Sequence, residues 1–177
     1  AWINPFRIAF DDDVSMLAPD HPAMQWIKDK TDDVVFVNGG IYFSPASMNA
    51  QKLVLDGVRE IIRKYDVDGI HIDDYFYPPD LNNEDKVQYE VYRKNGGMLD
   101  ISQWRRENVN ALVSAMYLKV KSFGGDKLFS VSPAGNIDKN YSQLYADVSL
   151  WCKGGYCDMV LPQIYFGFQN DSLPFEK

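Results

Sequence analysis

The most informative stretch of this sequence is Tyr65-Asp66-Val67-Asp68-Gly69-Ile70-His71-Ile72-Asp73-Asp74-Tyr75-Phe76-Tyr77-Pro78-Pro79. It begins as a buried strand would, with its two isoleucines on one face. Side chains alternate along a strand, so His71, Asp73 and Tyr75 fall on the opposite face. A covered parallel strand is normally apolar on both faces, because burying unpaired charge is costly. We therefore expect a functional site at the C-terminal end of this strand.

Two adjacent acids such as Asp73 and Asp74 often only cap a helix or line a solvated turn. The neighbouring residues favour a functional role here. His71 lies two residues before Asp73 on the same strand face, and the aromatic run from Tyr75 to Tyr77 follows at once. Aromatic rings beside carboxylates at a strand end are typical of a surface that holds a sugar ring.

The composition indicates one globular domain of 177 residues with a sizeable core. Aromatic residues make up 14% of the chain, so we expect some of them to face a ligand. The net charge of −7 argues against a nucleic-acid partner, whose phosphates require a basic surface. Since no apolar run reaches about 18 residues, we expect no membrane span.

The first residues, Ala1-Trp2-Ile3-Asn4-Pro5, resemble the middle of a strand and contain no signal peptide. We therefore expect further sequence to precede them.

The sequence predicts no metal site and no cofactor. Two cysteines, Cys152 and Cys157, and two distant histidines do not match the spacing of zinc ligands. Three consecutive acids at 11–13 cannot all reach one ion, so they are interpreted as a solvated loop. A local disulfide between the cysteines is possible in an exported protein, but two packed free thiols are favoured.

Strands and helices alternate along the chain. Asp20 and Pro22 are expected to open a short helix, Asn38-Gly39-Gly40 to turn a hairpin, and Asp100 with Gln103 to form a capping box. Residues 76–100 are expected to form a long functional loop. The first expected strand is a short one that begins at Trp2 and runs into a loop carrying Asn4 and Arg7. The other expected strands are 34–37, 41–43, 68–74, 128–133 and 158–166, and the expected helices are 20–27, 48–65, 100–123 and 141–152.

The remaining candidate functional groups follow expected strands: Asn4, Arg7, Asn136, Gln163 and Tyr165. An open α/β sheet would bring them into one crevice, and a (β/α)₈ barrel would place them around one mouth. No glycine-rich phosphate loop follows any strand, which weakens the nucleotide-binding alternative.

Five motifs resemble the glycosyl-hydrolase-like family ten, a bacterial TIM-barrel family formerly grouped as a domain of unknown function. In chain order they are Ala1-Trp2-Ile3-Asn4-Pro5-Phe6-Arg7, Asp68-Gly69-Ile70-His71-Ile72-Asp73-Asp74-Tyr75-Phe76-Tyr77-Pro78, Trp104-Arg105-Arg106-Glu107-Asn108-Val109-Asn110, Ser130-Val131-Ser132-Pro133 and Leu161-Pro162-Gln163-Ile164-Tyr165. The resemblance implies an extracytoplasmic or lipoprotein glycosidase that acts on cell-wall or other complex glycans.

The same resemblance implies an α/β fold of the (β/α)₈ barrel type, of which residues 1–177 form one partial domain. The motifs account for roughly strands three to six. Half a barrel has two unpaired edges, so we expect it to be completed by the missing remainder of the barrel or by self-association. We also expect the 177-residue chain alone to hydrolyse little, while a longer parent protein is active.

A weaker likeness links Asp68–Tyr75 to the catalytic strand of family-eighteen chitinases, Asp-Gly-x-Asp-x-Asp-x-Glu. Tyr75 stands where that family has its catalytic Glu. The chitinase mechanism therefore cannot be transferred.

Glycoside hydrolysis usually needs two carboxyl groups. Asp73 is predicted to be the main catalytic carboxylate, and Asp74 to serve as acid or as substrate ligand. The second catalytic partner could lie outside this chain. His71 is expected to hydrogen-bond Asp73 and hold it ionised. The alternatives are a non-catalytic carbohydrate-binding barrel and a phosphate-handling barrel.

The same interpretation gives the other candidates a part in substrate binding. The groups expected to bind sugar hydroxyls are Asn4, Arg7, Asn136, Gln163 and Tyr165. Tyr75 and Tyr77 either stack on sugar rings or pack under the following loop.

Overall fold

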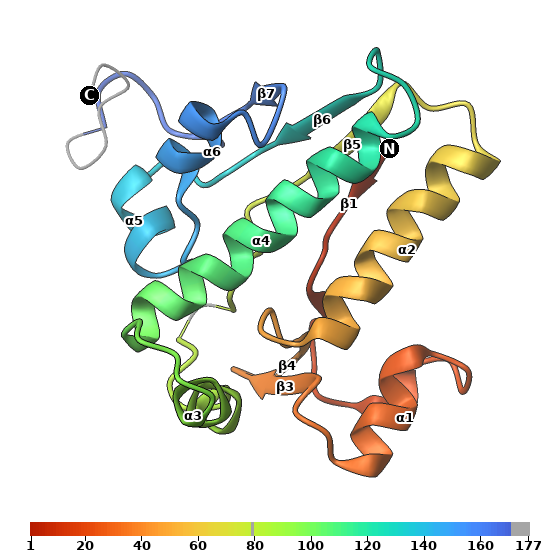
Figure 1. Cartoon of the computed structure of the whole chain (residues 1–177), viewed down its shortest axis with the longest axis vertical. Coiled ribbons are helices and arrows are strands. Elements are labelled where there is room, and N and C mark those ends of the chain that lie inside the picture. The colour runs from red at the N-terminus through yellow and green to blue at the C-terminus, as the bar shows by residue number, and fades with distance from the viewer. Residues whose placement is uncertain (79, 171–177) are drawn as a thin grey trace.

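The computed structural model describes residues 1–78 and 80–170, and these residues form two sheets with helices around them (Figure 1). The larger sheet is parallel, with strand order β1-β5-β6-β7. Its strands are β1 (Trp2–Ile3), β5 (Gly69–Ile72), β6 (Leu128–Val131) and β7 (Met159–Val160). The smaller sheet is antiparallel, with order β2-β4-β3, and consists of β2 (Arg7–Ala9), β3 (Val34–Val37) and β4 (Gly40–Phe43).

The register of β5 against β6 separates an apolar face from a polar one. Ile70 pairs with Phe129 and Ile72 with Val131, and all four side chains are buried. Helices α2 (Met48–Lys64) and α4 (Ile101–Lys121) run along this face (Figure 1). His71 lies on the other face. The predicted alternation of β5 is therefore confirmed.

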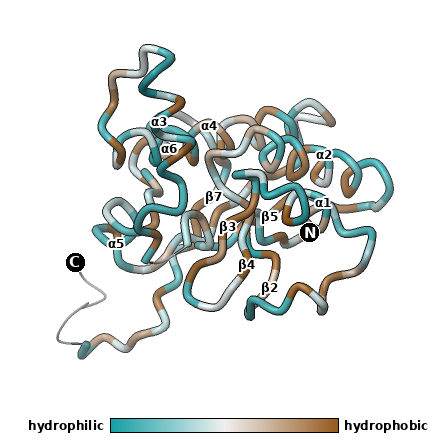
Figure 2. The backbone as a smooth tube through the Cα atoms, turned by 90° about the horizontal axis from the view of Figure 1, so that it is seen from below, coloured by the Kyte–Doolittle hydropathy of each residue, from teal (hydrophilic) through white to brown (hydrophobic). Residues whose placement is uncertain are grey.

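The remaining helices are short. They are η1 (Val14–Met16), α1 (Pro22–Asp29), α3 (Lys86–Lys94), α5 (Ile137–Ser142) and α6 (Val148–Gly154). In Figure 2 the strands at the centre carry brown, hydrophobic segments, while α2 alternates between brown and teal along its turns. That alternation is expected of an amphipathic helix with one buried face.

Several sequence predictions about local structure are confirmed. Asn38 and Gly39 turn the β3–β4 hairpin with positive φ angles of 50° and 71°. This is the conformation that Asn and Gly adopt most readily. Asp100 and Gln103 form the predicted capping box at the start of α4. The cap of α1, however, is His21 and not Asp20, because His21 Nδ1 accepts the N–H of Ala23 at 3.1 Å.

Three predicted elements differ from the structure. The expected helix 141–152 is two helices, because Tyr145 takes a left-handed φ of 53° and Asp147 caps α6 anew. The expected strand 158–166 pairs regularly only over Met159–Val160, and Pro162 has no N–H for a ladder. Residues 76–100 are not one loop, since they contain α3.

The parallel sheet is open within the described residues, with β1 and β7 as its edge strands. Its first strand is short, as expected, and ends at Ile3 before the turn that carries Asn4, whereas Arg7 begins β2 and is not in a loop. None of the described helices is long and apolar enough to cross a membrane.

Candidate active site

A cleft of about 450 Å³ opens at the C-terminal ends of the parallel strands. Residues from β1, β5, the ends of β6 and β7 and the start of β2 line it, namely Trp2, Arg7, His71, Asp73, Tyr75, Ser132, Gln163 and Tyr165. Six of the ten candidate residues predicted from the sequence, Asp73 among them, are therefore in its wall. Such an edge is where α/β folds place their ligands.

Asp73 lies one residue beyond β5 and is only 4% exposed. Its Oδ2 accepts a hydrogen bond from Asn4 Nδ2, and its Oδ1 accepts one from the N–H of Tyr75, both at 3.3 Å. Burial raises the pKa of Asp73, and the neighbouring charge of Asp74 adds to this, while the Tyr75 hydrogen bond and the charge of Arg7 oppose it. Protonation of Asp73 therefore extends to a higher pH than for an ordinary aspartate.

His71 does not play the part predicted for it. Its Nδ1 lies 2.8 Å from Ser130 Oγ, and no hydrogen bond joins it to Asp73 within the described residues. The cause is the β5–β6 register, which sets His71 opposite Ser130. Burial lowers the pKa of His71, although the charge of Asp73 opposes this. The hypothesis that His71 holds Asp73 ionised is therefore wrong.

Arg7 is held at the cleft between two aromatic rings. Its guanidinium carbon lies 4.0 Å from the ring centroid of Phe10 and 3.7 Å from that of Tyr75. The backbone N–H of Arg7 donates to Asn4 Oδ1 at 2.9 Å, which fixes the turn between β1 and β2. Cation–π contacts with both rings orient the guanidinium, whose N–H groups can donate hydrogen bonds to a ligand.

Asp74, the second acid of the pair, is held by Gln163 and not by Asn4. Gln163 Nε2 donates to Asp74 Oδ1 and to the carbonyl oxygen of Ser132, both at 3.0 Å. Gln163 reaches this position through an isolated parallel bridge with Ala134, beyond the end of β7. The two adjacent carboxylates thus have different partners: Asn4 contacts Asp73, and Gln163 contacts Asp74.

Four of the candidates do not line the cleft: Asn4 and Asp74 are bonded to the wall residues Asp73 and Gln163, while Tyr77 and Asn136 have structural roles elsewhere. Tyr77 is fully buried, its hydroxyl accepts from Asn108 Nδ2 at 3.2 Å, and burial strongly raises its pKa. It packs under the following loop, which was the alternative to sugar stacking. Asn136 is the N-cap of α5, where its Oδ1 accepts the N–H of Lys139 at 2.9 Å. Neither residue lines the cleft.

Sequence reasoning also missed two residues of the cleft wall. Trp2 is 71% exposed and meets the His71 ring edge-to-face at 6.0 Å. Ser132 follows β6. Both stand in motifs quoted for the family resemblance, and Trp2 was detectable as an aromatic residue of the strand that precedes Asn4.

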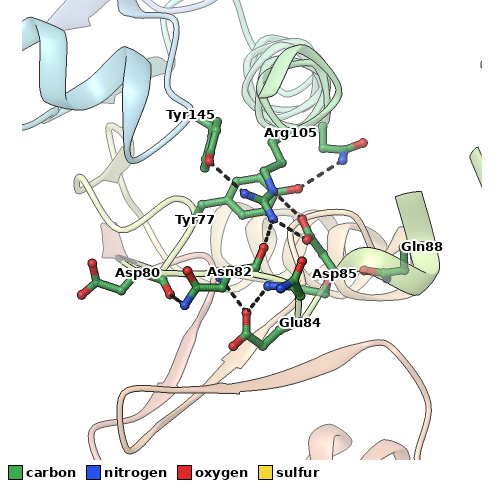
Figure 3. Close-up of polar contacts among 11 residues, drawn as sticks. Tyr77, Asp80, Asn82, Glu84, Asp85, Gln88, Arg105 and Tyr145 are labelled. Atoms are coloured by element: carbon green, nitrogen blue, oxygen red, sulfur yellow. Dashed lines mark hydrogen bonds and ion pairs between the residues drawn. The ribbon is translucent and has the colours of Figure 1, made fainter. Parts of the chain in front are cut away.

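The loop that leaves Asp73 and leads into α3 is fastened by a buried arginine (Figure 3). Arg105 of α4 donates to Asp85 through Nε at 2.7 Å and Nη2 at 2.6 Å. It also donates to the carbonyl oxygen of Asn82 and, through Nη1, to the hydroxyl of Tyr145 at 2.8 Å. Half of the predicted long loop is therefore a packed structural element.

The sequence analysis also made predictions about metal ligands and about the two cysteines. Within residues 1–78 and 80–170, no group of three or more His, Cys, Asp or Glu side chains is arranged to hold a metal ion. Cys152 and Cys157 are free thiols, but Cys152 is exposed and Cys157 half-buried, so the expectation of two packed thiols is wrong for Cys152. Burial raises the pKa of Cys157 to about 11.

Comparisons with known proteins agree with the motifs. The glycosyl hydrolase YngK of Bacillus subtilis (strain 168) is 34% identical over 99% of this chain and 37% of its own length. The glycosyl hydrolase DigH of Escherichia coli (strain K12) is 28% identical over 99% of this chain and 44% of its own length. The chain therefore spans less than half the length of these curated relatives.

A solved Paenibacillus structure, a cycloisomaltooligosaccharide glucanotransferase complexed with cycloisomaltoheptaose, aligns with 92% of this chain and 21% of its own. The TM-score is 0.47 and the identity 13%, which is too low to infer a shared fold. The family model described as Glycosyl hydrolase-like 10, in contrast, matches residues 1–175. The chain thus belongs to the glycosyl hydrolase-like family 10.

Proposed function

We propose that this chain carries the catalytic carboxylate of a glycoside hydrolase that cleaves O-glycosidic bonds in a cell-wall or other complex glycan. The observation that carries the proposal is Asp73, a buried carboxyl group with a raised pKa in the wall of an aromatic cleft. Glycosidases need such a group, because a carboxylic acid must still hold a proton to give it to the leaving oxygen.

In this proposal Asp73 is the general acid. Its proton passes to the glycosidic oxygen as the bond to the sugar carbon breaks, and the carboxylate left behind is stabilised by the Asn4 amide and the Tyr75 N–H. Asp74, held by Gln163, binds substrate. The second carboxyl group, as nucleophile or base, comes from the part of the protein that completes the cleft.

The walls of the cleft suit a sugar chain. Trp2 and Tyr165 are 71% and 87% exposed, and Tyr75 is partly exposed, so each presents apolar ring surface to a ligand. Arg7 supplies donors, and Gln163 supplies an amide beside Asp74. Aromatic faces cover the C–H surface of a pyranose while polar groups bind its hydroxyls.

We further propose that the open parallel sheet is half of a (β/α)₈ barrel, covering roughly strands three to six. Three features support this: the alternation of helices with parallel strands that are neighbours in chain order, the long helices α2 and α4 on one face of the sheet, and the share of the relatives' length that the chain spans. An extracytoplasmic location belongs to the same proposal and rests on the family membership.

The test is hydrolysis of oligosaccharides prepared from bacterial cell-wall glycan by the protein that contains this chain, with products followed by mass spectrometry. Asp73→Asn should lower turnover about 10²–10⁴-fold. Asp66→Asn is the matched control, since Asp66 is exposed just before the same strand. Glycan binding without any turnover by the unaltered protein would instead favour the carbohydrate-binding alternative.

A further inference from the structure

A second cavity, of about 450 Å³, shares no lining residue with the cleft. It lies where α3 and the first half of α4 meet the segment before β3 and the segment before α2. Nothing in the proposed reaction uses it.

One wall of this cavity is aromatic and held in place. The rings of Tyr92 and Trp104 meet at 6.1 Å between centroids, and Tyr89 stacks behind Tyr92 at 6.1 Å. The hydroxyl of Tyr92 accepts the N–H groups of Met98 and Leu99, each at 3.1 Å. The ring is therefore positioned before any ligand arrives, which reduces the cost of binding.

Trp104 also contributes a hydrogen-bond donor that has no partner. The residue is 6% exposed, and its indole N–H makes no hydrogen bond within the described residues. Among the described residues, every fully buried side-chain nitrogen or oxygen has a hydrogen-bond partner. Because Trp104 Nε1 has none, this atom is accessible to solvent. Trp104 is also one of the residues that line the cavity.

The cavity wall also contains hydrogen-bond acceptors. The carboxylate of Asp32 is exposed and has no hydrogen bond among the described residues, whereas Asp33 is already bound by Thr31 and Ser47. Asn108 gives its amide N–H to Tyr77, which leaves its oxygen free to accept. The two acids make the cavity unfavourable for an anionic ligand.

We propose that this cavity is a second glycan-binding site that takes one uncharged pyranose unit. Its apolar side lies against Val91 and the edge of the Tyr92 ring, an oxygen of the sugar accepts the Trp104 N–H, and a hydroxyl donates to Asp32. The inference rests on the proposed function, because the ligand is the same class of glycan. A site of this kind holds a long chain on the protein while the cleft acts elsewhere along it.

Indole N–H resonances in ¹H–¹⁵N NMR spectra test this site and the cleft in one titration. The chain has four tryptophans. Trp2 reports on the cleft and Trp104 on the cavity, while Trp151 is a buried control, with its Nε1 bonded to Asn110 at 2.7 Å. The probes are the tetramer of N-acetylglucosamine, which is uncharged, and the tetramer of galacturonic acid, which is anionic. The Trp104 signal is assigned with Trp104→Phe.

The expected result is that the uncharged tetramer shifts the Trp104 resonance saturably, that the anionic tetramer does not, and that Trp151 stays fixed. Val91→Glu should raise the midpoint of the Trp104 shift about tenfold or more, because it replaces apolar cavity wall with an acid. Val87→Glu makes the same change one turn earlier, outside the cavity, and should leave the midpoint unchanged.

Movement of Trp2 with a stationary Trp104 would overturn the second site and leave the proposed function standing. Movement of Trp104 with a stationary Trp2 would support the second site and count against the cleft. An equal response to both tetramers, or equal effects of the two valine variants, would overturn the proposed site as well.

Discussion

Asp73 and Asp85 lie at the two ends of one loop and are both buried, but their hydrogen-bond partners differ. Asp73 and Asp85 are 4% and 1% exposed. Asp85 receives two charge-assisted hydrogen bonds from Arg105, at 2.6 and 2.7 Å. Asp73 receives two neutral hydrogen bonds at 3.3 Å and has no ion pair within the described residues.

The contrast separates structure from function. A buried carboxylate that is paired with a cation is held ionised, whereas burial without such a partner raises the carboxyl pKa. An arrangement of the second kind is expected where proton transfer is needed. Asp85 thus fastens the loop, whereas Asp73 has the pairing that the proposed general acid requires.

The largest expected effect on stability comes from removing Arg105, the cation that pairs with Asp85. Arg105→Met should lower the free energy of unfolding by about 3–5 kcal/mol, because it leaves Asp85 buried without a cation. Urea unfolding followed by circular dichroism measures this. Lys52→Met removes an exposed ion pair with Asp56 and should cost about 0–1 kcal/mol.

A double variant sharpens the first prediction. Arg105→Met combined with Asp85→Leu removes both charges and should recover much of the lost stability. If the double variant is no more stable than Arg105→Met alone, uncompensated charge is not the cause of the loss.

Much of the cleft could be predicted because its signals are local. The alternation of apolar and polar residues in 69–75 placed Asp73 and Tyr75 on the non-helical face, and the chain order of strands brought Arg7 and Gln163 to the same edge. Sequence spacing alone is enough for such inferences, since strand periodicity fixes which side chains share a face.

The buried network could not be predicted, because its contacts join distant residues. Asp85 and Arg105 are separated by 20 positions, and Asp85 looked like one acid among many in a polar segment. Helix α3 was missed for a related reason: Val87 and Val91 are exposed, and only Tyr89 and Tyr92 pack inward, on Trp104. The His71 prediction failed because strand register cannot be read from one strand.

Tyr75 and Tyr77, two residues apart on the loop after β5, test where the chain passes from the cleft into the buried network around Arg105. Tyr77→Phe should cost about 0.5–1.5 kcal/mol of stability, because the Asn108 amide loses its acceptor. Tyr75→Phe should cost less than about 0.5 kcal/mol, since Tyr75 is 39% exposed at the cleft. Chemical unfolding of both variants measures the difference, and equal costs would mean that the boundary is misplaced.

A smaller effect concerns the pH dependence of stability. The pKa of Asp73 is raised in the folded state, so between its unfolded value, about 3.9, and that raised pKa the native protein binds more protons than the unfolded chain. Stability from this group is therefore lost as pH rises through that window. Asp73→Asn should gain stability relative to the unaltered protein as pH rises from acid to neutral.

Asp66→Asn provides the baseline for that series of unfolding curves, because its side chain is exposed. A difference between the Asp73→Asn and unaltered proteins that does not change with pH would show that Asp73 titrates as it does in the unfolded chain.

The smallest expected effect tests how Arg7 influences Asp73. The charge of Arg7 lowers the pKa of Asp73, but burial acts in the opposite direction and prevails. Arg7→Gln removes that charge, so the pKa of Asp73 should rise further, and the carboxyl group should stay protonated to a higher pH. Arg59→Gln, on the exposed face of α2, should leave it unchanged. Titration of the ¹³C-labelled carboxyl group of Asp73 by NMR measures both variants. A fall in the pKa of Asp73 on removing Arg7 would mean that the guanidinium acts mainly by shielding the carboxyl from water, and not through its charge. The cleft would then hold its proton by burial that depends on the Arg7–Tyr75 stack, and this stack would become the feature that distinguishes Asp73 from Asp85.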